Sequence, residues 1–199
     1  MRPAYHTIVV GLVTGLFFFA LLAVLVRLAL RVRSAEDSPL ATYADRAAIA
    51  AASLGLALTV IGIISGFLVW PLEATLRSPV MKNKILSSFL ILAFWGAYLV
   101  VRIRRGAQVW HNLTMSVYLA LLALSGFAFG MITSSIGGDA AGNPSGFENI
   151  VRIFGVETRF TFYLPTWLNL LIIVLGIGAL VLGITMKRGQ SADPLGARV

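Results

Sequence analysis

The sequence predicts an all-helical protein, a polytopic bundle of about five transmembrane helices in a single membrane domain that covers residues 1–188. Three observations predict this fold. Hydrophobic residues make up 58% of the 199 residues and charged residues only 12%, whereas a soluble domain carries about 25% charged residues. Long apolar runs recur along the chain, and about 20 such residues cross the hydrocarbon core of a bilayer. Start and stop signals for helices separate these runs.

The first two helices are expected at residues 7–30 and 44–70. The first apolar run is too long for the core of a signal peptide, and it is therefore interpreted as a retained helix. Thr42, with Asp45 three residues later, fits a capping box that opens the second helix. Pro71 stops that helix because proline cannot continue the hydrogen-bond ladder.

The third and fourth helices are expected at residues 79–105 and 110–133. Ser78 and Pro79 form a start signal, an N-cap followed by proline at the first helical position. Gly106 ends the third helix, as glycine commonly does.

The chain beyond the fourth helix is expected to form an outer loop, a fifth helix and a tail. The loop covers residues 134–163, and its first part, 134–146, is rich in Gly, Ser, Asn and Pro. Charged and apolar residues alternate after it, which favours a short helix in the membrane interface, although a re-entrant or extended segment fits as well. The fifth helix is expected at 165–186 and a flexible tail at 189–199.

The distribution of basic residues predicts the orientation of the chain. With five spans, ten of the 16 Lys and Arg fall on the side that holds the C-terminus, and six on the other side. Cytoplasmic loops carry the excess of positive charge in membrane proteins. The sequence therefore predicts a multi-pass protein of the cell membrane with its N-terminus outside and its C-terminus in the cytoplasm.

Composition also excludes several functions. A net charge of +8 would suggest nucleic acid for a soluble protein, but here the basic residues flank hydrophobic spans and are expected to contact lipid headgroups. The absence of cysteine excludes disulfides, thiolate metal sites and cysteine catalysis. The sequence contains no recognisable catalytic or metal-binding pattern, and we expect neither kind of site.

Two histidines, His6 and His111, are the candidate cofactor ligands, because haem b in membrane proteins is usually held by histidine. His6 is expected just before the first helix on the outer side, and His111 at the start of the fourth helix on the inner side. The hydrocarbon core is about 30 Å thick, so both residues of one chain cannot hold one haem. Each could bind haem or quinone with another ligand, but an interfacial histidine bonded to headgroups or backbone is the favoured interpretation.

Three pairs of glycines with G-x-x-x-G spacing predict close helix packing. They are Gly11 and Gly15, Gly62 and Gly66, and Gly126 and Gly130. The partner helix is expected within the chain, with a second chain as the alternative.

Ionisable residues are expected only at the edges of the spans. Asp45 and the other acidic residues are assigned to loops or helix ends, and Arg27 is expected to extend to the inner surface. Ion-coupled transporters usually carry a carboxylate at mid-depth, so this pattern argues against such a transporter acting alone.

Residues 5–140 resemble a group of small four-helix prokaryotic membrane proteins that is catalogued as a domain of unknown function. The resemblance rests on His6, Gly66, Asn83 and the Gly137-Gly138 pair. The His-Pro opening and further histidines of that group are missing here, which weakens any metal or haem role. The resemblance implies the four-helix fold, with the fifth helix as an addition, and it implies no activity.

The leading functional hypothesis is a non-catalytic accessory or structural subunit of a larger membrane complex, such as a respiratory or other energy-transducing complex. Its partners would be other membrane subunits or further copies of the chain, with residues 134–163 as the docking surface. One alternative is a membrane redox protein that binds haem or quinone. Another is an oligomeric carrier of a small neutral or lipophilic solute.

Overall fold

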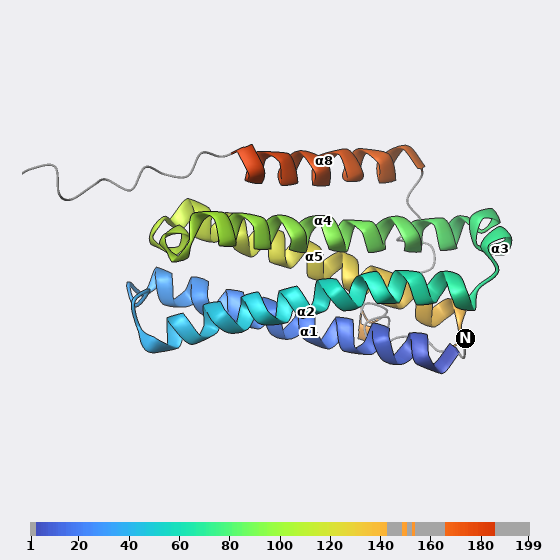
Figure 1. Cartoon of the computed structure of the whole chain (residues 1–199), viewed down its shortest axis with the longest axis horizontal. Helices are drawn as coiled ribbons and strands as arrows, with labels where there is room; N and C mark the ends of the chain where they lie inside the picture. Colours follow the sequence, from blue (N-terminus) through green and yellow to red (C-terminus); the bar gives the residue numbers. More distant parts are fainter. Residues whose placement is uncertain (1–2, 143–148, 151–152, 154–165, 186–199) are drawn as a thin grey trace, which may run out of the picture.

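The structure is a computed structural model that describes residues 3–142, 149–150, 153 and 166–185. Every regular element in these ranges is helical (Figure 1). In chain order the elements are α1 (Pro3–Val32), α2 (Pro39–Val69), α3 (Leu72–Arg77), α4 (Pro79–Arg105), the 3₁₀ helix η1 (Ala107–His111), α5 (Leu113–Ala140) and α8 (Thr166–Thr185). Most of the expected interfacial segment and all of the tail lie outside the described residues.

Four of the described helices are long and apolar enough to cross a membrane. These candidate spans are Ala4–Val32, Pro39–Val69, Val80–Arg105 and Leu113–Ala140. They indicate a multi-pass membrane protein. A fifth span at α8, which has 20 residues, remains a prediction, and so does the orientation of the termini.

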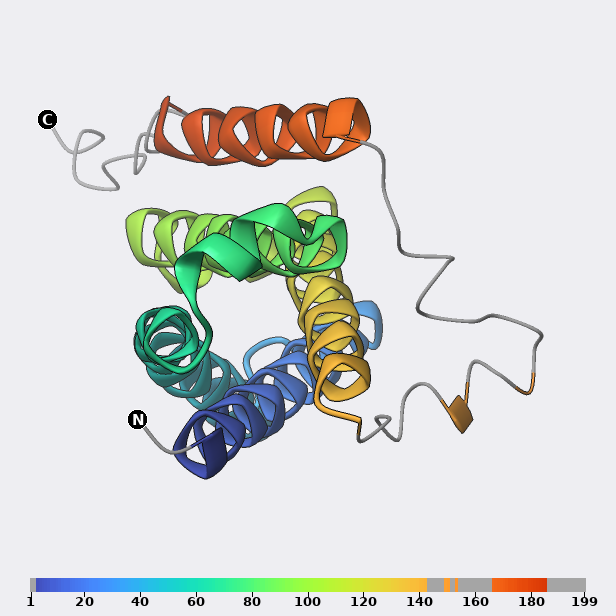
Figure 2. The same cartoon turned by 90° about the vertical axis from the view of Figure 1, so that its right-hand side faces the viewer.

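The four long helices form one bundle, and α8 lies outside it. Viewed along the bundle in Figure 2, α1, α2, α4 and α5 surround a common interior. The helix α1 packs against α2 and α5, and α4 packs against α5 and α2. The helix α8 lies along α4, where Gly176 comes close to Ala93 and Leu90.

Local signals account for the ends of α4, which covers the same residues as the predicted third helix. The Ser78 hydroxyl oxygen accepts a hydrogen bond from the Met81 amide at 3.4 Å, and Pro79 takes the first helical position. Gly106 ends the helix with a φ of 65°, a conformation that favours glycine.

The helix α2 begins at Pro39, five residues before the predicted start, which corrects the capping-box interpretation. Its N-cap is Ser38, whose hydroxyl oxygen accepts from the Ala41 amide at 3.3 Å. Asp45 instead lies inside the helix and is buried.

Two other predicted boundaries also require correction. The helix α1 begins at Pro3, so His6 lies within it. The helix α5 runs to Ala140, through the Gly137-Gly138 pair that was expected in a loop. It begins after Asn112, whose side-chain oxygen accepts from the Met115 amide at 3.1 Å, so His111 precedes the helix in η1.

Aromatic side chains fill the middle of the bundle. Phe17 of α1 stacks on Trp95 of α4 with ring centroids 4.9 Å apart and planes 8° apart, and Tyr98 meets Trp95 edge-on at 5.5 Å. All three are almost completely buried. This aromatic core separates two polar clusters, one toward each end of the bundle.

Candidate functional site

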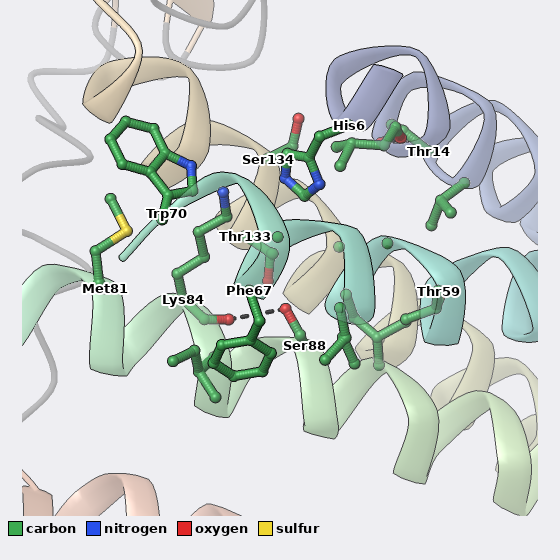
Figure 3. Close-up of a pocket in the computed structure, with 18 residues that line it drawn as sticks. His6, Thr14, Thr59, Phe67, Trp70, Met81, Lys84, Ser88, Thr133 and Ser134 are labelled. Carbon is green, nitrogen blue, oxygen red and sulfur yellow. Dashed lines mark hydrogen bonds between the residues drawn. The ribbon is translucent and has the colours of Figure 1, made fainter. Parts of the chain in front are cut away.

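The first polar cluster lines a cavity of about 90 Å³ near the end of the bundle where α1 begins (Figure 3). All four long helices contribute to its wall. Most of the lining is apolar, and the polar groups include those of His6, Thr14, Lys84 and Thr133. Because Phe67 and Trp70 also line the cavity and are 39% and 38% exposed, the cavity reaches the surface of the bundle beside α2.

His6 is fixed in the cavity wall by the neighbouring helix α2. Its Nδ1 lies 2.9 Å from the hydroxyl oxygen of Ser65, and that hydroxyl donates to the Gly62 carbonyl at 3.0 Å. Since the serine hydrogen is used there, Nδ1 is assigned as the donor to Ser65, and neutral His6 keeps a lone pair on Nε2. Nε2 is buried and has no hydrogen-bond partner among the described residues.

Lys84 enters the same cavity from α4, as Figure 3 shows. Its ammonium lies against the backbone of α5, where a Cβ on Gly137 would come within 2.7 Å of Nζ. Gly66 makes room for the imidazole in the same way, since its Cβ would lie 3.3 Å from Cε1 of His6. Two glycines therefore allow both basic side chains to reach the cavity.

The positions on which the expected resemblance rests all lie toward this end of the bundle. Gly66 touches His6, Gly137 touches Lys84, and Asn83 is the buried neighbour of Lys84 in α4. His6 and Gly66 are far apart in sequence, as are Lys84 and Gly137, so only the fold brings each of these pairs together.

The second polar cluster is a buried ion pair toward the other end of the bundle. Asp45 of α2 and Arg102 of α4 are 6% and 8% exposed. Arg102 donates from Nε to Oδ1 of Asp45 at 2.7 Å and from Nη2 to Oδ2, and the Trp110 indole donates to Oδ1 at 2.7 Å. These bonds join α2, α4 and η1.

Two further arginines extend this cluster to the connection between α1 and α2. The guanidinium of buried Arg27 lies 5.4 Å from the centre of the Trp110 ring, and its Nη1 donates to the Glu36 carbonyl at 2.5 Å. Arg31 donates to the Glu36 carboxylate at 2.7 Å and to the His111 carbonyl at 2.9 Å. Each of the three guanidinium groups has a hydrogen-bond partner in this cluster, and two of them form ion pairs, so we interpret it as a structural clamp.

The fold does not bring the two histidines together. His111 is held beside Arg31, near the far end of α1 from His6. A helical rise of 1.5 Å per residue puts them about 35 Å apart along the bundle. His111 is largely exposed, and its Nε2 lies 3.6 Å from the Asp37 carboxylate. Within the described ranges, no group of three or more His, Cys, Asp or Glu could hold a metal ion.

The six glycines occupy different surroundings. A Cβ on Gly62 would lie 3.7 Å from Val9, and one on Gly126 would lie 2.6 Å from the Trp95 ring. Gly11 and Gly15 are exposed on α1, and a Cβ on either would meet nothing within 4 Å. A Cβ on Gly130 would also meet nothing within 4 Å, but Gly130 lines the cavity, whereas Gly11 and Gly15 lie on the outer surface.

The sequence predicted the long helices, but it did not predict which side chains contact one another between them. It assigned Asp45 to a helix end and did not single out Ser65, Lys84 or Arg102 as site residues. One signal was available, because a carboxylate within an apolar helix requires a partner. No protein-family model matches the chain, and neither a curated protein nor a solved structure shows a significant match to it.

Proposed function

We propose that this membrane protein binds a lipophilic molecule from the bilayer in the cavity between His6 and Lys84. The observation that carries the proposal is the cavity itself, with a mainly apolar wall from four helices and a few polar groups. Ligand sites typically combine an apolar pocket with a small number of placed polar groups that orient the ligand.

The position of the cavity supports a ligand from the membrane. It lies between helices that are long and apolar enough to be spans, and it reaches the surface at Phe67 and Trp70. The apolar part of a lipophilic molecule can therefore remain against the bundle surface while its polar end meets His6 and Lys84.

Filling the cavity tests the proposal. Gly130→Leu adds a side chain to the cavity wall at a position where a Cβ would meet no atom within 4 Å, so the new side chain begins in open space and extends into the cavity. We expect the purified wild-type protein to carry a lipophilic molecule in stoichiometric amount, and Gly130→Leu to lose it. Solvent extraction and mass spectrometry measure this.

The matched control is Gly11→Leu, which adds the same side chain to an exposed position of α1. It should retain the bound molecule. Equal occupancy in Gly130→Leu and Gly11→Leu, or no bound molecule in the wild type, contradicts the proposal.

The second candidate function is that of a subunit in a larger membrane complex. The observation that favours it is the exposed Gly11 and Gly15 pair on α1, which no described residue covers. Such a surface allows the backbone of another transmembrane helix to approach closely. Gly15→Leu should then reduce crosslinking to a partner chain in native membranes, whereas Gly130→Leu should leave crosslinking unchanged. A protein that yields no crosslinked partner would argue against this role.

A further inference from the structure

We infer that the molecule in the cavity carries an acid head group, a carboxylic acid or a phosphate monoester, which binds between Lys84 Nζ and His6 Nε2. This inference rests on the proposed function and adds the chemical class of the ligand. The carboxylic acid and the phosphate monoester share the required chemistry, namely an acidic O–H that can pass its proton to Nε2 beside a second oxygen that can accept from the Lys84 ammonium.

His6 supplies an acceptor for the acidic O–H. The Ser65 hydroxyl donates to the Gly62 carbonyl and accepts from Nδ1, so the free lone pair of neutral His6 lies on Nε2. Nε2 is buried without a partner in the part of the chain that the structure describes. A buried polar atom of this kind is costly unless a partner reaches it, and an O–H donor from the ligand would be such a partner.

Lys84 supplies the positive charge. It lines the cavity from α4, and none of the described residues around the cavity is acidic. A lysine within a mainly apolar wall is stabilised by an opposite charge. An anionic oxygen of the ligand would provide that charge at the point where Lys84 and His6 face the same space (Figure 3).

The two contacts together select an acid over other lipophilic molecules. The acid donates its O–H to Nε2, and its second oxygen accepts from the Lys84 ammonium. If the proton moves to Nε2, the products are an imidazolium and a carboxylate or phosphate anion, and no other reactant is needed. A quinone and a methyl ester have no O–H to donate to Nε2. An alcohol can donate to Nε2 and accept from Lys84 through its one oxygen, but it supplies no negative charge to the ammonium.

A competition experiment in neutral phosphatidylcholine nanodiscs tests the inference. Trp70 lines the cavity, so bound 11-bromoundecanoic acid should quench its fluorescence, and subtraction of the Trp70→Phe signal isolates this effect. We expect dodecanoic acid or dodecyl phosphate to reverse the quenching at lower concentration than dodecanol or methyl dodecanoate. The stronger of the two acids identifies the head group as carboxylate or phosphate.

Lys84→Met removes the charge and keeps a chain of similar length. Because a hydrogen bond between two charged groups is stronger than one to a neutral group, its loss should weaken the binding of the acids by about tenfold or more. Binding of dodecanol should weaken less, because its hydroxyl carries no charge. Lys82→Met is the matched control, since Lys82 is exposed, lies two residues away and does not line the cavity. It should leave all affinities as they are.

The outcomes distinguish the inference from the proposed function. If dodecanol or the methyl ester competes as well as the acids, or if Lys84→Met behaves like Lys82→Met, the acid head group is wrong while binding in the cavity stands. If none of the compounds gives saturable competition and Gly130→Leu changes nothing, both the proposed function and the inference fail.

Discussion

At the scale of single residues, Asp45 is a buried carboxylate held by two partner side chains. Its carboxylate lies inside an apolar helix and receives hydrogen bonds from both Arg102 and Trp110. Burying two charges costs several kcal/mol per ion, which good geometry and further hydrogen bonds offset. Each of the two buried charges is therefore stabilised by the other, and removing either one leaves its partner uncompensated.

Asp45→Asn should strongly destabilise the protein because it leaves the Arg102 guanidinium buried without an anionic partner. Removing one partner of a buried ion pair typically costs about 3–5 kcal/mol. The loss should appear as a lower unfolding temperature and a lower free energy of unfolding in the same detergent.

The exposed ion pair between Glu73 and Arg77 serves as the control for the buried pair between Asp45 and Arg102. Glu73 and Arg77 lie 2.5 Å apart but are 75% and 79% exposed, so Glu73→Gln should cost no more than about 1 kcal/mol. The double variant Asp45→Leu with Arg102→Met should recover much of the stability lost in Asp45→Asn. Similar losses in Glu73→Gln and Asp45→Asn would show that the buried pair has no special role.

At the scale of elements, glycines determine how closely the helices of the bundle approach. A Cβ on Gly126 of α5 would lie 2.6 Å from the Trp95 ring of α4, and one on Gly55 of α2 would lie 2.6 Å from Phe17 of α1. Contacts this short require the helices or the rings to move. The stacked Phe17 and Trp95 rings thus depend on glycine in the two opposing helices.

Gly126→Ala should therefore reduce stability, although alanine favours helix more than glycine does. Overpacking of a filled core costs about 1–3 kcal/mol, and the gain in helix propensity is no more than about 1 kcal/mol. Gly130→Ala, one turn further along α5, has open space and should be neutral or stabilising. Thermal unfolding of both variants checks the sign, and equal effects would contradict the packing argument.

The elements also show what the sequence could predict. The ends of α4 are encoded locally, in Ser78, Pro79 and Gly106, and the predicted range is the same as that of the helix. The start of α2 was wrong because Asp45 resembles a capping residue locally, whereas its partner lies 57 residues away. The end of α5 was wrong because Gly137 makes room for Lys84 inside a helix, and a glycine pair looks like a turn in sequence.

At the scale of the whole molecule, the fifth span decides on which side of the membrane the C-terminus lies. The chain has no cysteine, so single cysteines can report the side without background. With five spans and the N-terminus outside, Ala107→Cys and Ser191→Cys should be protected from a membrane-impermeant maleimide on intact cells. Ala74→Cys should be labelled. Labelling of both Ala74→Cys and Ser191→Cys would instead indicate that α8 does not cross.

The candidate site could be predicted from the sequence only in part. His6 was identified because histidine is rare in this chain and chemically versatile. Its environment could not be predicted, since Ser65, Lys84 and Gly137 come from three other helices. Hydropathy predicts where helices lie along the chain, but the pairing of their faces depends on tertiary packing.

The cavity lies to one side of the bundle's aromatic core. It opens toward the start of α1, whereas the Asp45–Arg102 pair lies on the other side of the Phe17, Trp95 and Tyr98 rings. If the cavity binds a lipophilic molecule as proposed, that molecule would therefore be taken from one leaflet of the bilayer and returned to the same leaflet.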